Sequence, residues 1–241
     1  MNCFFYVILG ILPSIIWLLF YLGKDAHPES KQQVLKIFCY GALATLPAFF
    51  MEKTLSDGIK DLILPHLLFA IMNFTISIAM VEEFLKYLVV REKAVTHSEF
   101  DEPVDVMIYM IVAALGFAAV ENILYIVSSL DFGASNNQVI KLSVSRFIGA
   151  TFLHTLCSGI IGYFWAMSLF RRTEKTRCLL LGFFIAVMLH GIYNFSKMEI
   201  SGETEMAVVE LSILIGSAIF VFWGFERLKK MPSVCHHKIK N

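Results

Sequence analysis

The sequence has few charged residues. Asp, Glu, Lys and Arg make up 17% of its 241 residues, whereas an average soluble domain has roughly 25%. Twenty basic side chains balance twenty acidic ones, and no basic domain that would suggest nucleic-acid binding stands out in the sequence. Five cysteines, an odd number with no Cys-x-x-Cys pair, imply no disulfide framework. The six prolines form no linker, and no repeat or low-complexity segment divides the chain. These absences argue against a soluble, disulfide-rich or multi-domain protein.

Hydrophobic residues dominate instead. They account for 57% of the sequence, and its mean hydropathy is +0.69. A transmembrane helix needs about 20 apolar residues, and seven runs approach or reach this length: roughly 3–22, 34–52, 67–91, 104–130, 147–170, 178–197 and 206–226. We therefore expect an all-α fold, a polytopic membrane bundle of about seven transmembrane helices in a single integral membrane domain over residues 1–241. Its expected location is the cell membrane, with the lipid bilayer as a partner.

The positions of Lys and Arg predict the orientation of the chain. Cytoplasmic loops of membrane proteins carry an excess of these residues. With seven spans and an outer N-terminus, fourteen basic residues fall in inner segments, five in outer segments, and Lys86 lies within a span. Arg146 is one of the five, just before the fifth span. This asymmetry favours an N-out/C-in topology.

Two adjacent carboxylates lie inside the third run. Lys86 follows Glu82 by four residues and Glu83 by three, so it can reach either carboxylate on a helix. An internal ion pair explains how one Glu is tolerated in a membrane, but it leaves a surplus negative charge. That surplus suits a general base. We expect one of the two Glu side chains to face a cavity and the other to hold Lys86, without knowing which does which.

Three further ionisable residues lie in three other runs. Glu121, His154 and His190 come within about 3 Å of one depth when counted from the centres of their runs. One Glu and two His form a ligand set known from catalytic zinc sites. Asn194 follows His190 by one helical turn and could orient the imidazole, hold a carbonyl or act as a further ligand. Taken singly, each residue could instead be a packing or ion-pairing residue.

The expected depth of Glu82 and Glu83 in the membrane differs from that of Glu121, His154 and His190. Counted from the centre of the run 67–91, Glu82 and Glu83 lie toward the inner side, about 10 Å from the other three residues. This separation is too large for direct contact. A third span that begins nearer residue 72, with the preceding residues on the membrane surface, would remove the difference.

The order of these residues resembles that of the PrsW family of intramembrane proteases. The resemblance rests on Glu82-Glu83-x-x-Lys86, Phe117-x-x-x-Glu121-Asn122, His154 followed by Gly162-Tyr163, and His190-Gly-x-Tyr-Asn194. It covers about residues 80–195, within an expected catalytic core of about 67–197.

The resemblance implies hydrolysis of a peptide bond in a membrane-bound protein substrate, such as site-one-like cleavage of an anti-sigma factor. It assigns water activation to Glu82 or Glu83. Glu121, His154 and His190 would bind a metal ion, with zinc as the expected metal, or would position water and the oxyanion. Asn194 would support the tetrahedral intermediate.

Other mechanisms use the same residues. In a metal-free glutamate-type protease of the same superfamily, Glu activates water, and His and Asn stabilise the oxyanion. A non-catalytic transporter or proton relay also needs intramembrane Glu and His, although the sequence lacks the duplicated halves of many transporters. A scaffold that binds a transmembrane helix after losing catalysis is a third possibility, against which the full set of motifs argues.

Overall fold

The computed structural model describes residues 3–24, 30–94, 102–170 and 174–231. Over these residues the secondary structure is helical, with no strand, as expected. The helices are α1 (Cys3–Leu22), α2 (Lys31–Lys60), α3 (His66–Met72), the π-helix η1 (Asn73–Met80), α4 (Val81–Lys93), α5 (Pro103–Asp131), α6 (Asn136–Ile148), α7 (Ala150–Phe170), α8 (Lys175–Glu199) and α9 (Glu203–Leu228).

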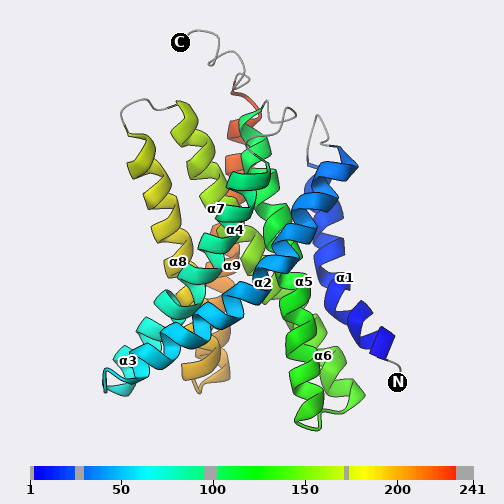
Figure 1. Ribbon diagram of the computed structural model, residues 1–241, viewed down its shortest axis with the longest axis vertical. Helices are drawn as coiled ribbons and strands as arrows, with labels where there is room; N and C mark the ends of the chain where they lie inside the picture. Colours follow the sequence, from blue (N-terminus) through cyan, green and yellow to red (C-terminus); the bar gives the residue numbers. More distant parts are fainter. Residues whose placement is uncertain (1–2, 25–29, 95–101, 171–173, 232–241) are drawn as a thin grey trace.

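Seven helical segments of the described chain are long and apolar enough to cross a membrane, which confirms the expected number. Two are composite: α3, η1 and α4 form one span over His66–Lys93, and α6 with α7 forms another over Asn136–Leu169. The fifth span therefore begins 11 residues before the expected 147. The first residues of α1 and the last residues of α9 lie at opposite ends of the bundle, as an odd number of spans requires (Figure 1).

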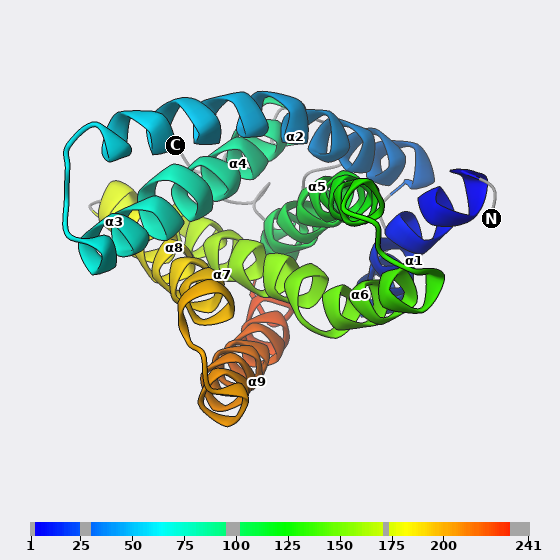
Figure 2. The ribbon, with the colours of Figure 1, turned by 90° about the horizontal axis from the view of Figure 1, so that it is seen from below.

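Helix α5 forms the centre of the molecule. Its residues from Pro103 to Ala119 are all buried, the pattern of a helix that is apolar all round and surrounded by other helices. Helices α1, α2 and α7 pack directly against it (Figure 2). Glycines allow the backbones of α2 and α5 to meet: a Cβ atom at Gly41 would overlap the carbonyl oxygen of Ala113, and one at Gly116 would overlap that of Phe38.

Two segments run obliquely across this bundle. Helix α2 descends away from α5, and α3, η1 and α4 return alongside it in the opposite direction (Figures 1 and 2). The return segment packs against α8 through η1 and against α5 and α7 through α4. It thereby brings the start of α4 to the middle of the bundle, where α5, α7 and α8 also meet.

Candidate active site

Five of the expected site residues converge from three spans. Helix α4 carries Glu82, Glu83 and Lys86, and the two histidines, His154 and His190, come from α7 and α8. Lys86 and Glu83 are completely buried, and the other three side chains are at most 4% exposed. Ionised groups inside a membrane bundle need partners, and these residues are one another's partners.

Lys86 contacts both carboxylates. Its Nζ atom is 3.2 Å from Glu82 Oε2 and 2.8 Å from Glu83 Oε1. The expectation that only one Glu would hold the lysine is wrong, because positions three and four residues before Lys86 both lie within reach of its long side chain. The ammonium also lies 4.5 Å from the centre of the Phe117 ring.

The two carboxylates differ in how firmly they are held. Glu83 accepts hydrogen bonds from Lys86 and from Ser158 Oγ at 2.8 Å, and it lies 3.1 Å from His190 Nδ1. Glu82 has the Lys86 contact, with His154 Nδ1 at 3.6 Å and His190 Nε2 at 3.8 Å from its Oε2. Glu83 is therefore locked by close hydrogen bonds, whereas Glu82 faces the histidines at longer range.

His154 connects the cluster to Glu121. Its Nδ1 atom is 2.7 Å from Lys86 Nζ, and its Nε2 atom is 2.7 Å from Glu121 Oε2. An ammonium group can only donate hydrogen bonds, so Nδ1 accepts, and the ring proton on Nε2 is donated to Glu121. The two imidazole rings meet at near right angles, 5.0 Å apart.

Glu121 is paired with Arg146, which was expected in the loop before the fifth span. Arg146 of α6 donates from Nη2 to Glu121 Oε2 at 2.8 Å and from Nε to Asn122 Oδ1. Its side chain is 10% exposed and that of Glu121 is 18% exposed, which makes this pair the more accessible edge of the site. Sequence reasoning missed Arg146 because the polar residues of α6 hid the start of the fifth span.

Two other polar residues near the site were also missed or left without a role. Ser158, one turn after His154 on α7, bonds Glu83. Glu52 of α2 lies close enough for its carboxylate to interact electrostatically with Glu82 and Glu121. No residue spacing links Glu52 to the other motifs, so only the packing of α2 against α4 and α5 reveals it.

The expected depth difference between the paired acids and the histidines is absent. The third span has 28 residues, about 42 Å of helix against a hydrocarbon core of about 30 Å, and it lies obliquely in the bundle (Figure 1). Residue counts along an oblique helix overstate differences in depth. The earlier start of the fifth span also moves its centre toward His154.

Metal-ligating atoms gather in this cluster. One ligand atom each from Glu82, Glu83, His154 and His190 lie within 4.8 Å of one another. Glu121 was expected to bind the metal ion together with the two histidines. In the structure Glu121 lies behind His154, on its Nε2 side, and is paired with Arg146. Two carboxylates and two imidazoles suit a transition metal such as zinc.

Asn194 lies one turn beyond His190 on α8 and is half-buried. Within the described part of the chain, no group hydrogen-bonds to its side chain. The expectation of a role beside His190 therefore stays a prediction.

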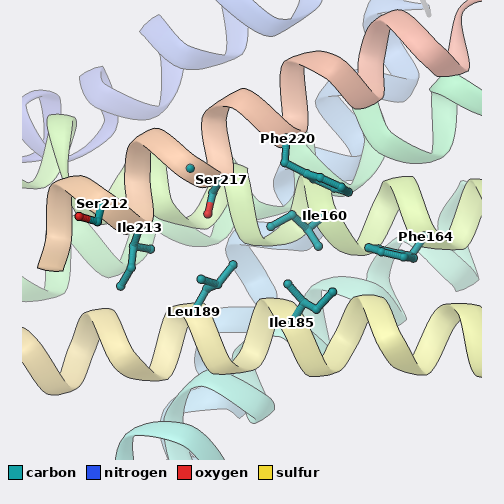
Figure 3. A pocket seen from close by; sticks show the side chains of 9 residues that line it. Ile160, Phe164, Ile185, Leu189, Ser212, Ile213, Ser217 and Phe220 are labelled. Carbon is teal, nitrogen blue, oxygen red and sulfur yellow. The ribbon is translucent and has the colours of Figure 1, made fainter.

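A separate apolar groove lies between α7, α8 and α9. Ile160, Phe164, Ile185, Leu189 and Phe220 line it (Figure 3). His190, the neighbour of Leu189, points instead to Glu83. This groove is therefore distinct from the polar cluster.

The fold and the cluster define a polytopic membrane protein whose ionisable and metal-ligating groups lie inside the bilayer-spanning bundle. The chain belongs to the PrsW family of intramembrane metalloproteases, whose sequence pattern matches residues 29–223. It is therefore a membrane-embedded protease, and membership of this family sets aside the transporter alternative.

Curated relatives agree with this assignment. The chain is 31% identical to Protease PrsW of Oceanobacillus iheyensis over 196 residues, which cover 81% of this chain and 84% of the relative. It is 29% identical to Protease PrsW of Geobacillus kaustophilus, covering 77% and 76%. Identity to Protease PrsW of Bacillus subtilis is 26%, over 93% of this chain and 94% of the relative. No solved structure gives a significant match.

Proposed function

We propose that this protease cleaves a single-span membrane protein, an anti-sigma factor or a similar regulator, by water attack at the buried Glu/His cluster. The observation that carries this proposal is the convergence of Glu82, Glu83, His154 and His190 within 4.8 Å, in a chain of the metalloprotease family. The whole chain acts as a single integral membrane domain in this proposal.

The donor set fits a metal ion. His154, His190 and Glu83 would hold it, since Nδ1 of His154 faces the cluster and Glu83 already lies against His190. Two histidines and one carboxylate with a fourth position for water are a common catalytic zinc site. When bound, the ion would polarise the scissile carbonyl and lower the cost of forming hydroxide from water.

Glu82 is the proposed general base. It is the less firmly held carboxylate, because its contacts with the histidines are longer than those of Glu83. A base must accept a proton from water and pass it to the leaving amine, which a carboxylate locked by several donors does poorly. Glu83 is fixed by Ser158 and Lys86 and serves as a ligand.

The remaining polar residues orient this machinery. The Glu121 carboxylate accepts the Nε2 proton of His154 and so turns Nδ1 toward the cluster. Arg146 holds Glu121 in this position. Partners of this kind fix the tautomer and orientation of ligating histidines. Asn194, with amide donors one turn from His190, is the proposed support of the oxyanion.

A metal-free glutamate mechanism is the second candidate. One observation favours it: the Lys86 ammonium already contacts Glu82, Glu83 and His154, three members of the cluster. A divalent ion and the ammonium compete for the same acceptors. In the metal-free form, Lys86 keeps the carboxylates charged and the two histidines and Asn194 stabilise the oxyanion.

Metal analysis tests these mechanisms. We expect about one zinc ion per purified chain by inductively coupled plasma mass spectrometry, and loss of that zinc in both His154→Ala and His190→Ala. An active wild type without bound metal would contradict the metal site and support the glutamate mechanism.

Cleavage is measured separately, by immunoblot of epitope-tagged single-span anti-sigma factors co-expressed with the protease. Glu83→Ala should abolish cleavage and leave the protein folded in detergent. Persistent cleavage in both Glu83→Ala and His154→Ala would contradict the proposed active site.

A further inference from the structure

The π-helix that precedes the catalytic glutamates contains two buried polar atoms. Ser77 is completely buried, and neither its hydroxyl nor Oδ1 of Asn73 has a hydrogen-bond partner among the described residues. Buried polar groups in proteins are nearly always hydrogen-bonded, so such atoms need an explanation. The π-helix is a rare form that is frequently found at functional sites.

Most other buried serines in the described helices have a hydrogen-bond partner: Ser143 and Ser158 bond groups of other helices, and two more bond a carbonyl of their own helix. Ser168 bonds the carbonyl of Trp165, and Ser196 bonds that of Tyr193, both at 2.7 Å. Ser14 and Ser217 also lack a partner, but they lie on α1 and α9, which carry none of the site residues.

The π-helix changes which residues share a face. In an α-helix with 3.6 residues per turn, Asn73 and Glu82 are two and a half turns apart and would point in opposite directions. The i→i+5 bonds of a π-helix widen each turn by about one residue. Over Asn73–Met80 this widening turns Asn73 toward the side of Glu82, while Ser77 shares the face of Val81, one turn later.

The neighbouring threonine marks the other side of this helix. Thr75 packs against Gly191 of α8, where a Cβ atom would lie 2.5 Å from Thr75 Cγ2, and its hydroxyl donates to the Ile71 carbonyl at 2.6 Å. Asn73 and Ser77 thus face away from the α8 contact that Thr75 makes.

Helix α2 lies on the side to which Ser77 points. Val81, one turn after Ser77, packs with Ala48 of α2 in an apolar cluster. Because the two segments run in opposite directions (Figures 1 and 2), Glu52, one turn after Ala48, comes to the level of Ser77. Glu52 also interacts electrostatically with Glu82 and Glu121. The Ser77 hydroxyl and the Glu52 carboxylate therefore lie where η1 packs against α2, about one helical turn before the catalytic glutamates of α4.

We propose that Asn73 and Ser77, opposite Glu52, bind the unwound backbone of the substrate next to its scissile bond. This inference rests on the proposed function. A transmembrane helix must open locally before water can attack its carbonyl, and each freed N–H and C=O is then costly inside a membrane. The Asn73 side-chain oxygen accepts from a substrate N–H, and the Ser77 hydroxyl donates to a substrate C=O, which offsets this cost.

The test compares Ser77→Ala and Asn73→Ala with the control Thr75→Val. The control keeps the shape of Thr75 and its contact with Gly191 but removes a hydroxyl that is already bonded within the helix. The probe is a single-span anti-sigma factor that the wild type cleaves. Loss of one substrate hydrogen bond should raise KM about three- to tenfold in each test variant, with kcat and the control unchanged.

Thermal unfolding of the free protein in detergent is the second readout. Ser77→Ala should not lower the unfolding temperature, because the hydroxyl that it removes has no partner. A lowered unfolding temperature with unchanged KM would assign these atoms to internal structure and overturn the inference.

The outcomes separate this inference from the proposed function. A wild type that cleaves no anti-sigma factor refutes both. A wild type that cleaves, with unchanged KM in both variants, refutes the inference alone.

Discussion

At the scale of single residues, Lys86 determines how two carboxylates can share a membrane interior. It is completely buried and contacts Glu82, Glu83 and His154. Removing one partner of a buried ion pair leaves an uncompensated charge, which costs far more than loss of a surface pair. The lysine is therefore both a structural counter-ion and a competitor for any metal ion in the cluster.

Lys86→Met should destabilise the protein by about 3–5 kcal/mol in the presence of a chelator, because two buried carboxylates lose their cation. Added zinc should restore much of this loss. Thermal unfolding in detergent, with zinc or with chelator, measures both effects. Lys60→Met is the matched control: Lys60 pairs with Asp57 at an exposed position, and such pairs contribute at most about 1 kcal/mol. A Lys86→Met protein as stable as wild type in chelator would contradict this account.

Arg146→Met should impair catalysis through His154. It leaves Glu121 without its cation, and loss of a partner that orients a ligating histidine typically reduces activity about 10- to 100-fold. Cleavage rate and unfolding temperature are both measured. Adding Glu121→Leu should recover stability, since the unpaired charge is removed, but not activity. Arg91→Met, at an exposed pair with Glu92, is the control that should change neither.

At the scale of helices, close backbone contacts set the position of the site. Gly41 of α2 meets Ala113 of α5, and Gly116 of α5 meets Phe38 of α2. Small residues allow this approach in membrane bundles. The contact lies in the same part of α5 as Phe117 and Glu121, so it sets how α2 lies relative to the end of α5 that carries Glu121.

Gly116→Ala should lower stability by about 1–3 kcal/mol, because the added methyl group meets backbone atoms that cannot move aside cheaply. The unfolding temperature in detergent measures this loss. Gly216→Ala on α9 is the control, since its Cβ atom meets nothing within 4 Å and alanine favours helix by about 1 kcal/mol. Equal effects of the two substitutions would contradict the close-contact account.

Hydropathy located the spans better than it located their ends. Apolar runs marked all seven membrane helices, because each presents a long apolar face. Helix α6 was missed because its sequence from Asn136 to Arg146 is largely polar. Its polar side chains are used inside the bundle: Ser143 bonds the Leu9 carbonyl, and Arg146 bonds Glu121. A hydropathy scale counts every polar residue as unfavourable in a membrane, even where other helices supply its hydrogen-bond partners.

At the scale of the whole molecule, the odd number of spans places the start of α1 and the end of α9 on opposite sides of a membrane. The basic residues predict that the C-terminal end is inside. Under this topology, the turn after α2 faces outward.

Labelling of single cysteines tests the orientation. In a background without native cysteines, Lys60→Cys should react with a membrane-impermeant maleimide on intact cells. Lys229→Cys should react only after the cells are permeabilised. The reverse pattern would contradict N-out/C-in.

The sequence by itself determined the membrane location, the number of membrane helices and most members of the buried Glu/His cluster. Length and hydrophobicity decide whether a helix enters a bilayer, and an ionisable residue within it must be satisfied or functional. Only the tertiary structure decided which of these residues meet. It brought Glu82 and Glu83 to the histidines, placed Glu121 behind His154 with Arg146, and brought Glu52 close enough to interact electrostatically with Glu82. Helix tilt, the π-helix and the α2–α5 contact set these distances, and each depends on packing between helices rather than on the order of residues within one.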